Sequence, residues 1–303
     1  MINELRLGAN FILEILARRY EYERVPEPDL VMDNPDNVRE YRDAGLATGN
    51  GSSVYLYNMI LLSGAIRPGM TVLDLACGPA NLLVELARMH PKANFIGIDL
   101  SPAMLSCAED MKVSAGVQNV RFICGDITSL TMLDDQSADI VMSTLSLHHL
   151  PEQSMLERCV KEIARVVRAD GAVHLMDFAS LKRRSTAQYF AYQRTLGLGP
   201  FLAKDYENSL RAAFRIDVFN ALLPMLQAVV PSVQLHKTAG VPFMVAITSL
   251  KRPVLDTRSQ HLLAAYWYGM LPNQRSDFEA MRLFFSLDGL RTPHPRKMIS
   301  TPI

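Results

Sequence analysis

The sequence contains few cysteines, and none of them forms a closely spaced pair. Cys77, Cys107, Cys124 and Cys159 are scattered through 303 residues without a CxxC motif. Zinc sites and redox disulfides generally need closely spaced cysteines, and disulfide frameworks belong mainly to short secreted chains. We therefore expect four reduced thiols, no disulfide and no metal site.

The chain also lacks an excess of either charge and a long apolar run. Lysine plus arginine and aspartate plus glutamate both total 31, so the net charge is zero. Proteins that bind nucleic acid or an anionic membrane usually carry a basic surplus. The longest apolar stretch, Phe219–Val230, contains polar residues and a proline and is shorter than the ~20 residues of a membrane helix. With no signal-peptide layout near the first residues, we expect a cytoplasmic protein that acts on a small molecule.

The middle of the chain alternates short apolar strands with segments of helical periodicity. Five such units predict a parallel sheet with helices on both faces, that is, an α/β fold. Their strands are Thr71–Leu75, Asn94–Asp99, Val120–Cys124, Asp139–Thr144 and Ala172–Asp177, the last preceded by a turn at Asp170-Gly171. Two more strands, Val233–Thr238 and Phe243–Leu250, raise the number to seven, and we expect the second to pair antiparallel at an edge of the sheet.

Helical segments flank and interrupt this pattern. Residues 1–66 read as an N-terminal helical extension, residues 180–230 as a helical insertion, and residues 251–303 as a C-terminal helical appendage. The first 57 residues contain five of the ten tyrosines, which suits a lid over a small-molecule pocket, although simple packing onto the domain explains them equally well. The appendage could close the pocket or pair with a second subunit, and a homodimer is possible.

The stretch Thr71–Asn81, TVLDLACGPAN, reads as a buried strand, a glycine turn and a helix start. Acids end three successive strands at Asp74, Asp99 and Asp126, and ligands of open α/β sheets bind outside these strand ends. Asp99 follows the turn by about 20 residues, the position at which an acid binds a ribose in dinucleotide folds. The turn has no further glycine to admit a pyrophosphate, and Asp74 would repel phosphate. A ligand with a ribose and a positive group fits better.

Five segments carry a family resemblance. VLDLACGPA at 72–80, IGIDLSPAML at 96–105, CGDI at 124–127, ADIVMSTLSLHHL at 138–150 and Met176-Asp177 occur in order and at suitable spacing. Together they resemble the class I S-adenosylmethionine-dependent methyltransferases, closest to the ubiquinone/menaquinone-methyltransferase-like branch. The resemblance implies a Rossmann-like, mostly parallel sheet over residues 67–250. Ala80 stands where the family often has a second glycine, which is a mild departure.

The resemblance also implies a site for S-adenosylmethionine. Asp74 and the backbone of 76–78 would hold the methionine end, Asp99 the ribose hydroxyls, and Asp126 the adenine amino group. Ordinary core packing remains the alternative for the apolar members of this set. The ten implied cofactor-binding residues are Asp74, Ala76, Cys77, Gly78, Asp99, Leu100, Met104, Asp126, Ile127 and Thr144.

Methyl transfer from a sulfonium depends largely on positioning, but a hydroxyl or amine acceptor can need a base. His148 and His149, just beyond the fourth strand, are the candidates, with a loop-anchoring role as the alternative. Asp177 could orient the acceptor or cap the following turn. We also predict that the tyrosines Tyr20, Tyr41 and Tyr206 contact the acceptor, although scaffold packing explains each of them as well.

The predicted function is methyl transfer to an oxygen or nitrogen atom of a small organic molecule, such as a secondary metabolite or a quinone. A C-methyltransferase of the same fold is one alternative. A nicotinamide-dependent oxidoreductase fits the glycine turn poorly, and a non-catalytic binding homologue would be expected to have lost Asp74, Gly78 or Asp99. An arsenic methyltransferase would need several cysteines near the acceptor, whereas these four fall on the predicted turn, a strand and helices.

Overall fold

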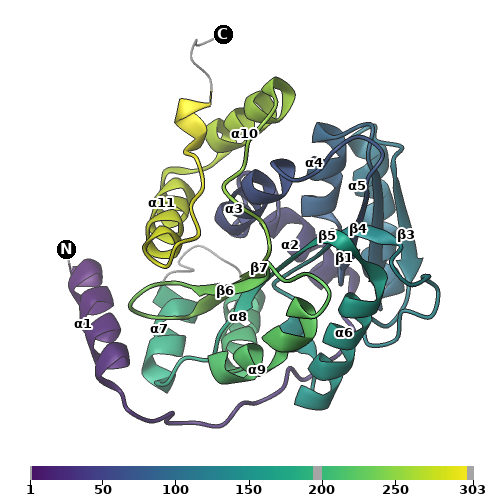
Figure 1. Cartoon of the computed structure of the whole chain (residues 1–303). Coiled ribbons are helices and arrows are strands. Elements are labelled where there is room, and N and C mark those ends of the chain that lie inside the picture. Colours follow the sequence, from purple (N-terminus) through teal and green to yellow (C-terminus); the bar gives the residue numbers. More distant parts are fainter. Residues whose placement is uncertain (1, 194–199, 299–303) are drawn as a thin grey trace.

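The computed structural model describes residues 2–193 and 200–298. Seven strands form one sheet in the order β3-β2-β1-β4-β5-β7-β6 (Figure 1). The strands are β1 (Thr71–Leu75), β2 (Asn94–Asp99), β3 (Val120–Cys124), β4 (Ala138–Thr144), β5 (Val167–Phe178), β6 (Gln234–Lys237) and β7 (Met244–Thr248). All are parallel except β7, which pairs antiparallel with both β5 and β6. The predicted α/β, Rossmann-like, seven-stranded, mostly parallel fold is confirmed.

Helices cover both faces because the strands are apolar on both sides. Val72 and Leu73 are fully buried on opposite faces, each in a different core cluster. Buried strands of parallel sheets read as continuous apolar runs, as β1 does. One face is covered mainly by α3 (Ser52–Ser63), α4 (Asn81–Met89) and α5 (Pro102–Ser114), and the other by α6 (Gln153–Val166) and α9 (Ile216–Gln227).

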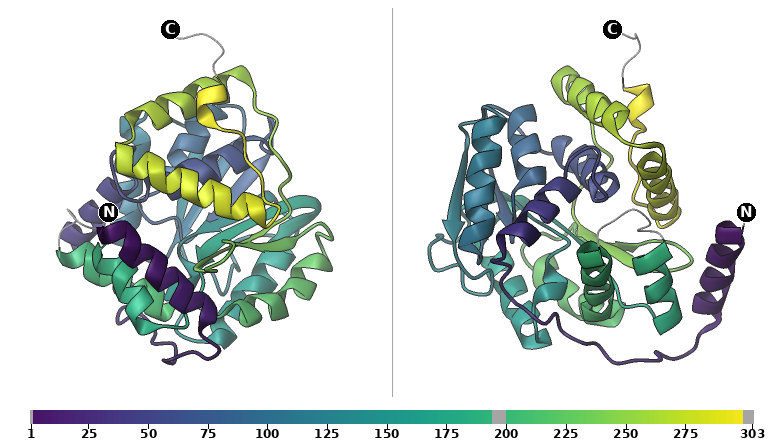
Figure 2. Two further views of the ribbon diagram at one scale, coloured as in Figure 1. Left: turned by 90° about the vertical axis from the view of Figure 1, so that its left-hand side faces the viewer. Right: turned by 180° about the vertical axis from the view of Figure 1, so that it is seen from behind.

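The remaining helices form the additions to this core. They are α1 (Ile2–Leu16), α2 (Pro35–Ala44), α7 (Arg184–Gln193), α8 (Pro200–Ala212), α10 (Thr257–Gly269) and α11 (Pro272–Leu287), with short 3-10 turns at Leu147–His149 and Pro295–Lys297. Figure 2 shows α1 beside α7 at the outside of the molecule. α11 packs on α3, where the rings of Tyr57 and Phe285 stack 5.3 Å apart. Each helix in the described ranges is too short or too polar to span a bilayer.

Three details of the sequence prediction are wrong. β5 begins at Val167 rather than after Asp170-Gly171, because the expected turn lies within an irregularity of the β4–β5 pairing. A Cβ on Gly171 would lie 2.8 Å from the Asp139 carbonyl oxygen, so only glycine allows this close approach. β7 is an interior strand, and β6 forms the edge.

The third error concerns the alternation of strands and helices, which is interrupted after β3. Residues 125–137 form turns and no helix, and side chains of α6 bind their backbone. The guanidinium of Arg165 donates to the carbonyl oxygens of Leu130 and Leu133 at 2.8 and 2.9 Å. Glu162 accepts the Leu130 amide at 2.8 Å. These side-chain bonds satisfy backbone groups that a helix would otherwise satisfy internally.

His174 in the middle of β5 is fully buried. Its Nδ1 lies 3.0 Å from Thr248 Oγ1, and its Nε2 bonds Asn58 Oδ1. Burial lowers the pKa of His174 to about 3. The imidazole is therefore neutral in the folded protein at neutral pH and throughout mild acidification.

This burial predicts an acid-sensitive fold. Between pH 6.5 and 3 the unfolded chain binds a proton at His174 that the native state does not bind. Folding stability should therefore be complete above about pH 6.5 and fall below it by up to about 1.4 kcal/mol per pH unit. Urea unfolding between pH 7.5 and 5 should show a smaller slope in His174→Gln, whereas His261→Gln, an exposed change, should keep the parent slope. Equal slopes in the parent and His174→Gln would contradict this.

Candidate active site

The turn after β1 has an unusual backbone conformation. Ala76, Gly78 and Ala80 all have positive φ, at 54°, 53° and 61°. This region is costly for residues other than glycine, so the surrounding bonds must hold the two alanines in it. Two bonds tie the turn to β2: the Cys77 amide donates to the Ile98 carbonyl oxygen at 3.0 Å, and the Gly78 amide donates to Asp99 Oδ2 at 2.8 Å.

The Asp99 carboxylate therefore stabilises the turn, and it also faces the crevice at the strand ends. Its Oδ1 accepts the Ser101 amide at 2.9 Å, so each carboxylate oxygen has one backbone donor. Burial raises the pKa of Asp99, and the amides of Ser101 and Gly78 oppose this shift. A carboxylate has about four lone-pair positions, so both oxygens keep a free position for a pair of vicinal hydroxyls.

A cavity of about 430 Å³ lies along the carboxyl ends of β1, β2 and β4. Nine of the ten predicted cofactor residues line it: Ala76, Cys77, Gly78, Asp99, Leu100, Met104, Asp126, Ile127 and Thr144. Thr144 Oγ1 is buried and has no hydrogen-bond partner within the described residues. The cavity therefore combines apolar side chains with several acids and has an unpaired hydroxyl at the end of β4. Their roles toward a cofactor stay predictions.

Asp74, near the end of β1, is the exception, because it is not among the residues that line the cavity. Its side chain is buried, and no described residue donates a hydrogen bond to its carboxylate. Burial raises the pKa of Asp74 well above its ordinary value, and the nearby Asp99 raises it further. A buried carboxylate without a donor calls for a cation. The ammonium of S-adenosylmethionine suits that need, so these residues fit the cofactor that the sequence predicts.

A second cavity, of about 630 Å³, adjoins the first. Aromatic and methionine side chains form much of its wall, and no lysine or arginine of the described chain lines it. None of the four cysteines lines it either, and all four are free. Tyr41, Leu145, His149 and Asp205 line both cavities and so mark where the two meet. The aromatic residues of the second cavity are Phe11, Phe178, Phe190, Tyr206, Phe243 and Phe284.

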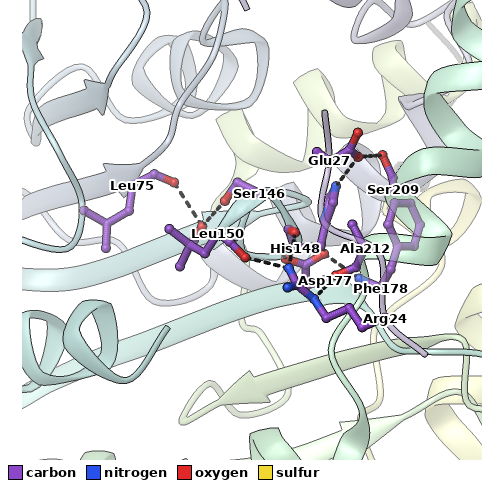
Figure 3. A network of polar contacts seen from close by, with 11 residues as sticks. Arg24, Glu27, Leu75, Ser146, His148, Leu150, Asp177, Phe178, Ser209 and Ala212 are labelled. Carbon is purple, nitrogen blue, oxygen red and sulfur yellow. Dashed lines mark hydrogen bonds and ion pairs between the residues drawn. The ribbon is translucent and has the colours of Figure 1, made fainter. Parts of the chain in front are cut away.

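His148 lies at this junction and is held by Asp177 at the end of β5. Its Nδ1 lies 2.6 Å from Asp177 Oδ1, and its backbone amide donates to Asp177 Oδ2 at 3.1 Å (Figure 3). Both side chains are almost fully buried. Burial lowers the pKa of His148, but the contact with Asp177, together with Glu27 and Asp205, outweighs this effect and raises it. Burial, helped by the neighbouring His148, lowers the pKa of His149 well below its ordinary value.

Arg24 from the N-terminal extension fastens the loop that carries the two histidines. Its guanidinium donates to the carbonyl oxygens of His148, Leu150, Pro151 and Ala212, at distances between 2.5 and 2.9 Å. The extension, the loop after β4 and the end of α8 are thereby joined at one point, which Figure 3 shows from close by.

The residues predicted to contact the methyl acceptor lie in different places. Tyr41 lines both cavities and donates a hydrogen bond to Asp205, and Tyr206 lines the second cavity. Asp177 lies behind His148, so it contacts the histidine rather than the cavity. Tyr20 lines neither cavity, because its ring packs 4.3 Å from the Arg215 guanidinium on the outer side of the insertion. Its position gives no support to an acceptor role.

Sequence reasoning missed Glu27, Arg24 and Asp205. Glu27 lines the first cavity, and Ser209 Oγ donates to its Oε1 at 2.9 Å. The three residues lie in an acidic loop and in a helical insertion, neither of which matches a motif. Only the excess of acids in residues 21–35 hinted at a site there.

Comparisons with known proteins identify the central part of the chain. Residues 66–208 match the family model of a methyltransferase domain. The chain is 30% identical over 161 residues to a demethylmenaquinone methyltransferase of Lactobacillus johnsonii, covering 51% of this chain and 62% of that protein. It is 30% identical over 146 residues to an arsenite methyltransferase of Halobacterium salinarum, covering 48% and 34%. The chain thus spans about one to two thirds of these relatives' lengths.

Two solved structures share the fold. An S-adenosylmethionine-dependent methyltransferase of Aquifex aeolicus aligns with a TM-score of 0.50 at 17% identity, over 72% of this chain and 98% of that one. The plantazolicin methyltransferase BpumL, in complex with a substrate analogue and S-adenosylhomocysteine, aligns with a TM-score of 0.51 at 13% identity, over 92% and 94%. Residues 66–208 therefore match a methyltransferase domain, and the sheet has the Rossmann-like fold of the class I methyltransferases, the class that uses S-adenosylmethionine.

The role of Asp99 can be tested by cofactor binding. Asp99→Asn keeps the shape of the side chain but removes the charge that strengthens hydrogen bonds from hydroxyls, which are worth ~1.5–3 kcal/mol each when charge-assisted. Binding of S-adenosylhomocysteine, measured by calorimetry, should weaken on the order of 10- to 150-fold. Asp110→Asn, an exposed change on α5, is the control and should bind as the parent does. Unchanged affinity in Asp99→Asn would show that Asp99 serves the turn alone.

Proposed function

We propose that the protein transfers a methyl group from S-adenosylmethionine to an oxygen or nitrogen atom of a small, largely apolar molecule, quinone-like or a secondary metabolite. One observation carries this proposal: an aromatic-walled cavity opens onto the crevice at the strand ends through His149 and Leu145. A donor in the first cavity and an acceptor in the second would meet there. Holding both at near-attack distance can supply ~7–11 kcal/mol of catalysis.

The lining of the second cavity supports the class of acceptor. Its aromatic and methionine side chains suit a flat ring system, and no lysine or arginine of the described chain lines it to bind an anionic one. The arsenite methyltransferase similarity is not extended to this chain, because none of its cysteines lines that cavity. A nicotinamide-dependent oxidoreductase is disfavoured by the methyltransferase-domain match, and a non-catalytic homologue by the presence of Asp74, Gly78 and Asp99.

The two histidines are the proposed catalytic residues. As the acceptor lone pair bonds the methyl carbon, the carbon–sulfur bond breaks and its electrons neutralise the sulfonium. The acceptor's proton then needs a base, and His148 and His149 are the imidazoles in the acceptor cavity wall. Asp177 is a positioning residue, because it bonds His148 Nδ1 and so leaves Nε2 as the atom available for the proton.

The location, the assembly and the domain division of the protein are proposals as well. A cytoplasmic location agrees with four free cysteines. A homodimer would cover the exposed apolar side chains of Ile12, Leu13, Ile15 and Leu16 on α1. The division into a lid (1–66), a catalytic domain (67–250) and an appendage (251–303) is likewise a proposal.

Filling the second cavity should impair the acceptor and not the cofactor. Met281→Trp places a larger side chain in the wall that α11 contributes. Overpacking costs ~1–3 kcal/mol, so kcat/KM for a hydroxyquinone or phenol acceptor should fall on the order of 5- to 150-fold. S-adenosylhomocysteine should bind unchanged. Leu283→Trp, on the exposed side of the same helix, is the control. An equal loss in both variants would mean that the cavity does not receive the acceptor.

The histidines can be separated from cofactor binding by kinetics. His148→Gln and His149→Gln should each bind S-adenosylhomocysteine, yet the variant that lacks the base should lose ~10²–10⁴-fold in kcat. Single-turnover methyl transfer, followed by mass spectrometry of the product, measures this loss. If neither variant changes kcat, the pair anchors the loop and positioning alone drives the transfer.

A further inference from the structure

The described residues contain one group of three side chains whose nitrogen and oxygen atoms could share a metal ion: Glu27, His148 and His149. One atom of each lies within 4.8 Å of the other two. Glu27 and His148 are 4% and 2% exposed, so water does not surround the group. Two imidazoles and one carboxylate are a common ligand set for zinc and other divalent transition metals.

The spacing of Glu27 and His148 suits an ion between them better than a direct bond. Glu27 Oε1 lies 4.0 Å from His148 Nε2, which is too far for a hydrogen bond (Figure 3). With Nδ1–H directed at Asp177, Nε2 presents a lone pair, so two electron-rich atoms face each other across this gap. Ligands at ~2.1 Å from one tetrahedral ion lie ~3.4 Å apart. Glu27 and His148 would therefore need to approach by about half an ångström, and the ligand atom of His149, within 4.8 Å of both, would need to approach as well.

The neighbouring charges favour a cation. Glu27, Asp177 and Asp205 all act electrostatically on His148. Two cations lie nearby. Four backbone carbonyl oxygens occupy the Arg24 guanidinium, which forms no ion pair with Glu27 in the described structure. Lys204, on the wall of the first cavity, pairs with Glu207 at 2.9 Å. The buried group thus carries more negative than positive charge. Within the described residues, no hydrogen bond reaches the ring of His149, which leaves its nitrogens available.

We propose that Glu27, His148 and His149 bind one divalent transition-metal ion at the junction of the two cavities, with Asp177 orienting the His148 ligand. A carboxylate on the second nitrogen of a metal-bound imidazole is the usual arrangement of such sites. Three protein ligands leave a fourth position open, and His149 places it beside both cavities. Oxygen-preferring Mg²⁺ and Ca²⁺ should bind poorly, because two of the three ligands are imidazoles.

The role that we assign to the metal ion rests on the proposed function. An ion there would take a hydroxyl or carbonyl oxygen of the acceptor as its fourth ligand and lower the pKa of a bound hydroxyl, whose proton would pass to water. The two imidazoles would then act as ligands, and the base role assigned to them would belong to the metal-free protein. An oxygen acceptor is favoured over a nitrogen or carbon acceptor on this ground.

The test is metal binding itself, with the full-length, untagged protein freed of metal by chelation. Co²⁺ titration should give one equivalent of a visible absorption band, and calorimetry with Zn²⁺ should give one site, with no comparable signal from Mg²⁺. Glu27→Gln and His149→Asn should weaken Zn²⁺ binding at least 10-fold, and Asp177→Asn should weaken it on the order of 10- to 100-fold. Circular dichroism and the melting temperature check that each variant is folded.

A second histidine–carboxylate pair provides the matched control. His294 bonds Glu279 near the C-terminal end of the described chain, and neither residue lines either cavity. His294→Asn should bind Zn²⁺ as the parent does. The proposal is overturned if the parent binds no Co²⁺ or Zn²⁺ stoichiometrically, or if His294→Asn alone removes the binding. Methyl transfer by a protein without bound metal would leave the proposed function intact and overturn only the metal's purpose.

Discussion

Parallel pairing of β1 with β2 and β4 is the constraint on which the site depends. Parallel strands end at the same edge, so β2 and β4, on either side of β1, present Asp99 and Thr144 along one crevice. The hydrogen bond from the Gly78 amide to Asp99 then fixes the turn in a conformation that its two alanines would not adopt alone. A ligand site with buried, unpaired polar groups follows from this geometry.

The helical segments added to the sheet contribute side chains to both cavities. Glu27 and Tyr41 come from the N-terminal extension, Asp205 and Tyr206 from the helical insertion, and Phe284 from the C-terminal appendage. Arg24 joins the first two of these to the loop after β4 through four carbonyl oxygens. Both cavities therefore combine residues at the strand ends with residues of the added segments, and the appendage contributes to the second cavity.

Much of the fold was predictable because its signals are local. β1, β2 and β3 have the predicted bounds, since each is an apolar run between turn residues. The Ser101 side chain caps α5 locally, accepting the Met104 amide at 3.0 Å. The errors arose where long-range contacts overrule local ones: Gly171 lies inside a strand because β4 approaches it, and residues 125–137 stay non-helical because Arg165 of α6 binds their carbonyl oxygens.

The sequence alone determined the first three strands, the glycine turn and nine of the residues that line the first cavity, because these signals lie in motifs and periodicities of a few neighbouring residues. Only the tertiary structure decided that Glu27, His148 and Asp177 meet, that Tyr20 faces away, and that an aromatic cavity closes over the crevice. Arg24 and His148 are 124 residues apart in the chain. Contacts of this kind depend on how whole elements pack, and no local pattern records which side chains that packing brings together.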